Sequence, residues 1–182
     1  MLFIKSYVLE RSDFLSQTFI LKPYDRTSAL SYAKEWSFKR NPKYYDFSEI
    51  GGDCTNFVSQ CLYAGGCVMN FTPNLGWYYT SISNRSAAWT GVPFFYKFMM
   101  TNESIGPFAT EVEDVSLLLP GDVIQFGNPG KGWHHSLLVL TAGYSYDDIL
   151  VATHTFDAYG KPLSDYFFTM VRFLHIEGIR TL

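Results

Sequence analysis

The stretch GGDCTNFVSQCLYAGG, residues 51–66, carries one apolar helical face between two pairs of glycines. Its apolar residues recur at the spacing of one side of an α-helix: Cys54, Phe57, Val58, Cys61 and Leu62. The pattern predicts a buried helix that begins at Cys54, and we expect Gly65 and Gly66 to end it. We expect this central helix to pack against a sheet.

Cys54 stands on the first turn of that helix, where a thiol has a chemical use. Unpaired backbone N–H groups and the positive end of the helix dipole stabilise a thiolate, which is the nucleophilic form. The same N–H groups can bind an oxyanion. The alternative is an inert core thiol, because Cys54 shares the buried face. We expect Asp53 to cap the helix through its carboxylate, with its side chain turned away from the thiol.

A cysteine nucleophile needs a base, and two predicted strands supply histidines. His134 and His135 open one strand, and His154 lies near the end of the next, so antiparallel pairing can bring them together. One histidine would pair with Cys54 and the other would orient it. His135 shares its strand face with Leu137 and Val139, which favours contact with the helix; His134 is the alternative. We expect His175 to be structural.

In the rest of the chain, the predicted helices come first and the predicted strands follow. A helix is predicted within residues 24–42, capped by Asp25 or Thr27, and a short helix near 92–99 lies in a loop-rich region. Strands are predicted in 121–127, 134–143, 149–157 and 166–176. Residues 1–22 are expected to form an arm or strand, and residues 23–182 one α+β domain.

Composition excludes several classes of protein. The chain has 182 residues, a net charge of −3 and no Lys/Arg cluster, so we expect no nucleic-acid partner. It has no apolar run long enough for a membrane span. The spacing of its three cysteines predicts neither a disulfide framework nor a zinc site, and no cofactor is implied. The N-terminus shows no signal peptide, which suits the bacterial cytoplasm or an excised domain of a secreted protein.

Five segments in order resemble the putative amidase domain family, found mostly in Gram-positive bacteria and related to NlpC-type papain-like cell-wall peptidases: YDRTSALSYAKEWSFKRNPKYYDF, GGDCTNFVSQCLYAGG, LLLPGDVIQF, HHSLLVLT and ILVATHTFD. The resemblance runs from about Tyr24 to Asp157. It implies a papain-like core in which Cys54 is the nucleophile and His135 the general base. The third polar residue would be His154, with Asp157 as the alternative.

These features predict a cysteine amidase or peptidase that acts through a thioester acyl-enzyme. The resemblance implies a peptide or a peptidoglycan stem peptide as substrate. Asp53, Trp77 and Trp89 are candidates for the substrate groove, although the two indoles would equally suit the core. One alternative function is a catalytically silent module that binds a peptide or glycan on segment 71–98. The other is an acyltransferase or crosslinking enzyme.

Overall fold

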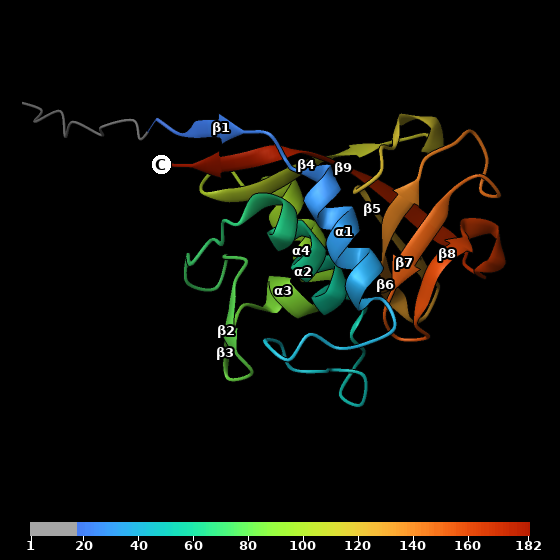
Figure 1. Ribbon diagram of the computed structural model, residues 1–182, viewed down its shortest axis with the longest axis horizontal. Helices are drawn as coiled ribbons and strands as arrows, with labels where there is room; N and C mark the ends of the chain where they lie inside the picture. Colours follow the sequence, from blue (N-terminus) through green and yellow to red (C-terminus); the bar gives the residue numbers. More distant parts are fainter. Residues whose placement is uncertain (1–17) are drawn as a thin grey trace, which may run out of the picture.

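The computed structural model describes residues 18–182 and shows an α+β protein, in which helices gather on one side of an antiparallel sheet (Figure 1). The helices are α1 (Arg26–Trp36), α2 (Cys54–Gly66), α3 (Ala87–Thr90) and α4 (Val92–Thr101), with short 3-10 turns η1 (Val115–Leu117) and η2 (Leu163–Asp165). The predicted α+β class is therefore confirmed. No helix in residues 18–182 is long and apolar enough to cross a lipid bilayer.

Seven strands form the main sheet in the order β1-β9-β5-β6-β7-β8, and β4 pairs with β9 as well. They are β1 (Ile20–Lys22), β4 (Gly106–Val112), β5 (Val123–Asn128), β6 (Gly132–Thr141), β7 (Leu150–Thr153), β8 (Ala158–Pro162) and β9 (Met170–Thr181). A separate hairpin joins β2 (Tyr79–Ser81) to β3 (Asn84–Arg85). The four predicted strands correspond to β5, β6, β7 and β9, whereas β4 and β8 were not predicted.

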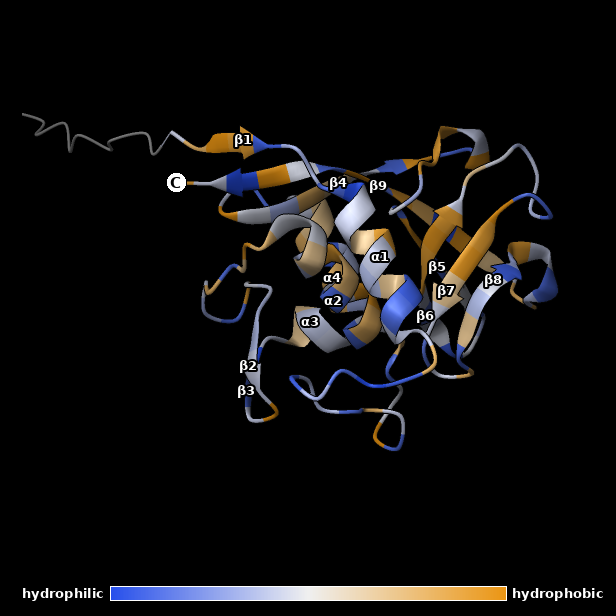
Figure 2. Cartoon of the chain, viewed as in Figure 1, coloured by the Kyte–Doolittle hydropathy of each residue, from blue (hydrophilic) through white to orange (hydrophobic). Residues whose placement is uncertain are grey.

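Both faces of the sheet are buried, and each face has its own core. Phe57 of α2 and Leu138 of β6 belong to the core between helices and sheet. Leu137 and Val139 belong to a second core on alternate residues of the strands. Apolar colouring accordingly dominates β5 and β7 (Figure 2). Because both faces are apolar, the alternation in β6 does not reveal which face meets the helix.

The start of β6 shows the consequence for His135. The Oγ of Ser136 lies 3.0 Å from the Oγ1 of Thr55 on α2, so Ser136 and Leu138 form the face beneath the helix. The prediction that the face of His135, Leu137 and Val139 meets the helix is therefore wrong. A polar residue was required there because Thr55 itself is buried and polar.

The N-terminal cap of α1 is one of the two residues that the sequence predicts. Asp25 caps α1, because its carboxylate accepts a hydrogen bond from the Ser28 N–H at 3.0 Å. Of the predicted N-terminal arm or strand, Ile20–Lys22 pairs with β9 as β1. Residues 1–17 lie outside the described residues.

The end of α2 differs from its prediction. Gly65 and Gly66 are the last helical residues, and the left-handed residue that terminates the helix is Cys67, with φ 55°. The glycines are needed for close packing instead. A Cβ at Gly65 would collide with the Tyr24 ring and lie 2.7 Å from the Asp25 carbonyl oxygen. The start of α1 can therefore approach α2 only where α2 lacks a side chain.

This close approach makes a prediction with a definite sign. Gly65→Ala should lower the free energy of unfolding by about 1–3 kcal/mol, because the methyl group overpacks the contact with Tyr24. Urea denaturation measures the change. Helix propensity alone would raise stability by about 1 kcal/mol, so a stabilised variant would contradict the packing argument.

Candidate active site

Cys54 is the first residue of α2 and is 6% exposed. Its Sγ lies 3.8 Å from the Thr55 hydroxyl. Burial raises the pKa of the Cys54 thiol; hydrogen bonds from the Ser136 N–H, the Thr55 hydroxyl and the Thr55 N–H act in the opposite direction, and the charge of Asp53 raises it further. The resting thiol is therefore protonated at neutral pH, and several donors already surround the position of a thiolate.

His135 lies on β6, one residue before the Ser136 N–H that faces the thiol. Its ring is 8% exposed and packs against Phe126, with 4.9 Å between ring centroids. Burial lowers the pKa of His135 to about 4, and His134 adds a smaller effect in the same direction. The imidazole is therefore neutral at neutral pH, as a general base must be.

Thr153 at the end of β7 orients this ring. Its Oγ1 lies 3.3 Å from His135 Nε2, and 2.9 Å from each of the carbonyl oxygens of Ser136 and His154. A hydroxyl has one proton, and a carbonyl can only accept it. The threonine oxygen then accepts the Nε2–H of His135, which leaves the lone pair on Nδ1. The neighbouring strand thus selects the tautomer of the histidine.

Cys54 meets β6 at the backbone N–H of Ser136, the residue after His135, and no hydrogen bond joins Cys54 to His135 among the described residues. The pairing of β6 with β7 begins at Leu138 and Ala152. Before that point the backbone of β6 is open to the thiol, which explains the contact with Ser136 N–H. The arrangement places a buried thiol against the backbone N–H of the residue that follows the neutral histidine.

His154 does not orient His135, contrary to the sequence prediction. Its Nδ1 lies 2.5 Å from the Oδ2 of Asp53, and its Nε2 lies 2.9 Å from the Trp36 carbonyl oxygen. The ring also stacks on Phe57, with 4.1 Å between centroids. Both nitrogens are therefore occupied on the helix side of β7. Thr153, one residue earlier, occupies the opposite face of the strand and meets His135.

Asp53 uses its carboxylate differently from the predicted cap. No side-chain capping bond is present at the start of α2. Instead the carboxylate accepts hydrogen bonds from the Phe47 N–H at 3.0 Å and the Asn56 side-chain amide at 2.8 Å, besides the contact with His154. The carboxylate is fully buried, so it is not available to line a substrate groove.

Asp157, the alternative for the third residue, has Arg40 and not His135 as its partner. Both of its oxygens lie 2.9 Å from the guanidinium of Arg40. Arg40 in turn lies 3.6 Å from Asp53 Oδ2 and 3.3 Å from Asp46 Oδ1. Asp157 therefore belongs to an ion-pair group that holds the turn after β7 to the loop between α1 and α2.

The two tryptophans predicted for a groove belong to the core. Trp77 and Trp89 are fully buried, 4.6 Å apart between ring centroids. The Trp77 indole donates to Ser59 Oγ, and the Trp89 indole donates to Asn56 Oδ1. Both therefore stabilise the polar side of α2, and the prediction that they line a groove is wrong.

The remaining histidines play no part in this arrangement. His134 is exposed, and its Nδ1 lies 3.0 Å from the Gly132 carbonyl oxygen. His175 Nδ1 lies 2.8 Å from the Asp122 carboxylate. In residues 18–182, no three His, Cys, Asp or Glu side chains are arranged to hold a metal ion.

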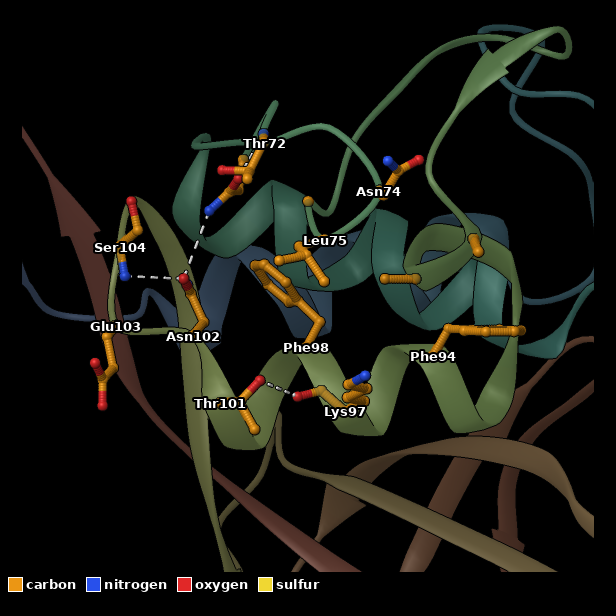
Figure 3. A pocket seen from close by; sticks show the side chains of 14 residues that line it. Thr72, Asn74, Leu75, Phe94, Lys97, Phe98, Thr101, Asn102, Glu103 and Ser104 are labelled. Atoms are coloured by element: carbon orange, nitrogen blue, oxygen red, sulfur yellow. Dashed lines mark hydrogen bonds between the residues drawn. The ribbon is translucent and has the colours of Figure 1, made fainter.

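A cavity of about 420 Å³ lies between α4 and the loop of residues 70–76 (Figure 3). Phe98 and Leu75 give it apolar walls, and Lys97 and Glu103 lie at its margin. Neither Cys54 nor a histidine lines it. The cavity falls partly within segment 71–98.

Sequence reasoning missed four polar residues that contact the thiol, His135 or one another. Thr153, Thr55, Ser136 and Gln125 are fully buried. The available signal is position: Thr55 follows Cys54 directly, and Ser136 is the polar residue between His135 and the apolar run of β6. Their partners could not be chosen without the register of β6 against α2.

Most of this chain is similar in sequence to known proteins. Residues 23–174 match the family model described as "Putative amidase domain". Over 137 residues the chain is 38% identical to the Bacillus subtilis (strain 168) protein described as "Uncharacterized protein YhbB". The alignment covers 74% of this chain but 42% of that relative, so the chain spans less than half of its length. No solved structure matches the chain.

The two rejected partners of His135 should differ sharply in their effect on stability. His154→Leu leaves the buried Asp53 carboxylate and the Trp36 carbonyl without their shared partner. We expect it to lower the free energy of unfolding by about 2–4 kcal/mol. Asp157→Asn removes a charge from a partly exposed pair and should cost less than about 1 kcal/mol. Chemical denaturation measures both, and equal losses would contradict this assignment.

Proposed function

The chain belongs to the putative amidase domain family, and we propose that it hydrolyses amide bonds with Cys54 as nucleophile and His135 as general base. The observation that carries the proposal is the thiol at the start of α2, set against the backbone next to a histidine whose free nitrogen is fixed by Thr153. We assign the domain to residues 23–182.

The proposed reaction forms a thioester and then hydrolyses it. His135 Nδ1 takes the thiol proton as Cys54 Sγ attacks the carbonyl carbon of the amide. The backbone N–H of Cys54, at the start of the helix, stabilises the oxyanion of the tetrahedral intermediate. When the C–N bond breaks, the leaving amine takes the proton from His135. Water, deprotonated by the same imidazole, then attacks the thioester and releases the acid and the thiol.

The electrostatics favour general-base catalysis over a preformed ion pair. Burial raises the pKa of Cys54 and lowers that of His135 to about 4, so the resting pair is a thiol and a neutral imidazole. Sequence reasoning alone favoured a thiolate at rest, from the helix terminus. The helix terminus and its neighbouring donors then act on the charge that develops as the proton leaves.

The same geometry supports a papain-like arrangement as a proposal. A helix that begins with the nucleophile packs on an antiparallel sheet that carries the histidine. The third residue of the site is neither a histidine nor a carboxylate: the hydroxyl of Thr153 meets His135 Nε2, the ring nitrogen that does not act as the base. Thr153 therefore takes the orienting role predicted for His154, or for Asp157 as the alternative.

The resemblance to cell-wall peptidases leads us to propose a peptide, such as a peptidoglycan stem peptide, as the substrate class. Acyl transfer to an amine would use the same thioester, and the nature of the acceptor decides between the two outcomes. Product analysis with added amines distinguishes hydrolysis from transfer.

The second candidate function, a peptide-binding module, is favoured by one observation. The cavity beside α4 offers apolar walls between a lysine and a glutamate, which suits a peptide with charged groups at both ends (Figure 3). Phe94→Ala should weaken binding of a stem peptide to the inactive Cys54→Ala variant at least about tenfold, measured by calorimetry. Unchanged affinity would remove the cavity from consideration.

Loss of either reacting group should abolish hydrolysis without unfolding the protein. Cys54→Ala and His135→Gln should lower kcat/KM for a peptide amide by at least about 1000-fold, because each removes an atom that takes part in the proposed step. Mass spectrometry of the products measures the rate. His134→Gln is the matched control, since its exposed ring is adjacent in sequence and should retain activity. An active Cys54→Ala variant would overturn the proposal.

The acid limb of the pH–rate profile should identify the base. His135 accepts a proton only when neutral, and burial lowers its pKa to about 4, so kcat/KM should fall as the pH drops through about 4. A typical exposed histidine would place this limb at about pH 6.5. A limb at that higher value would indicate a different base or a solvated His135.

A further inference from the structure

A continuous set of hydrogen bonds leads from Arg172 on β9 to the thiol of Cys54. Its outer end joins Arg172 to Gln125 on β5: the Nε and Nη2 of the arginine lie 3.0 Å and 2.5 Å from Gln125 Oε1. Its inner end joins Gln125 Nε2 to Ser136 Oγ at 3.0 Å, and Ser136 Oγ to Thr55 Oγ1 at 3.0 Å. Thr55 Oγ1 lies 3.8 Å from Cys54 Sγ.

Two groups fix the direction of the hydrogen bonds of Gln125, because one of them can only donate and the other can only accept. A guanidinium can only donate, so the side-chain oxygen of Gln125 must face Arg172. The carbonyl of Val92 can only accept, and it lies 3.2 Å from Gln125 Nε2. Both constraints give the amide the same orientation, so Gln125 donates to Ser136.

The remaining protons then follow one after another. Ser136 Oγ accepts from Gln125, and among residues 18–182 Thr55 Oγ1 is the one other partner of this hydroxyl, so the Ser136 proton is satisfied only if it points to Thr55. Thr55 Oγ1 then accepts from Ser136, and its other partner in the same residues is Cys54 Sγ, to which its own proton is left. Every hydrogen bond in the series therefore donates toward the sulfur, which suits a thiolate better than a thiol.

The environment makes the series effective. Gln125, Ser136 and Thr55 are fully buried, and hydrogen bonds in a low dielectric polarise one another. Arg172 is 7% exposed and lies between two aromatic rings, 3.5 Å from the Tyr96 centroid and 4.1 Å from that of Trp133. A positive charge thus stands at the outer end of a water-poor series of dipoles.

We propose that this directed chain of hydrogen bonds, the Arg172–Cys54 chain, stabilises the negative charge that forms on Cys54 Sγ when its proton is removed; its members are Arg172, Gln125, Ser136 and Thr55. The proposal deepens the proposed function and rests on it for its catalytic meaning. Thr55 contacts the sulfur directly, whereas the other three act through it as positioning residues. No proton travels along the chain.

Other titratable groups also face the start of α2, and the test must separate them. Asp53 precedes the thiol and raises its pKa, but its carboxylate is paired with His154 from the end of β7 and lies 3.6 Å from Arg40. His135 lies on β6, one residue before Ser136, and is neutral above about pH 4, because burial lowers its pKa to that value. None of these groups belongs to the Arg172–Cys54 chain.

The test is the pH dependence of iodoacetamide alkylation at Cys54, followed by peptide mass mapping on the full chain. Thr55→Val keeps the shape of the side chain but removes the donor to sulfur. Its alkylation midpoint should rise by about one pH unit, which is a tenfold lower rate below the midpoint. Thr55→Ser keeps the hydroxyl and should restore the wild-type midpoint. The plateau rate at high pH separately reports access to the thiol.

Ser59→Ala is the matched control on the same helix. Ser59 is buried and hydrogen-bonded to Trp77 and the Trp89 carbonyl, but it has no link to Cys54, so its loss should leave the midpoint unchanged. Gln125→Glu is a second, independent variant of the same shape. A carboxylate cannot donate to Ser136, so the midpoint should rise here too, including in the case that Thr55→Val does not fold.

Two results would overturn the proposal. One is a Thr55→Val midpoint equal to that of Ser59→Ala, and the other is an unchanged midpoint in Gln125→Glu. Failure of the proposed function would look different: Cys54→Ala would keep its activity while the midpoint shifts remained. Alkylation requires no substrate, so the two failures are distinguishable.

Discussion

The contact between the first turn of α2 and the start of β6 is the interaction on which the rest of the structure depends. It buries a helix terminus, whose unpaired N–H groups would be costly without partners. Thr55 meets Ser136 there, and the Ser136 N–H meets the thiol. The polar residues at this junction therefore follow from burial as much as from chemistry. A helix start that was exposed would need none of them.

Three consecutive residues divide the work at that terminus. Asp53 turns toward His154 and the loop between α1 and α2, which fixes the approach to the helix. Cys54 faces the open edge of β6. Thr55 points into the polar interior of the sheet. Each side chain has a different neighbour because successive residues on a helix differ by about 100° in direction, so a nucleophile at this point is held from both sides.

Much of this could be predicted from the sequence, and the exceptions share one cause. The start of α2 at Cys54, the Asp25 cap and four strands follow from local patterns, which act within a few residues. The partners of His154 and Asp157 could not be predicted, because they depend on contacts more than 100 residues apart in the chain. The prediction of which strand face meets the helix was wrong for a related reason. Apolar alternation identifies the buried face of a strand only when the other face is exposed to solvent, and here both faces are buried.

The observed partners of His154, which differ from the predicted one, also explain why a histidine stands at this position. A planar ring with a nitrogen on each side can meet a buried carboxylate and a backbone carbonyl at once, and the two ring nitrogens of His154 lie within hydrogen-bond distance of both. His135 has a different task, which needs a neutral ring with one donor and one acceptor, and Thr153 together with burial provides it. Thr153, the last residue of β7, and His154, the first residue of the turn after it, have their partners on opposite sides of the sheet. The end of one short strand thus holds the base in one protonation state and anchors the helix that carries the nucleophile.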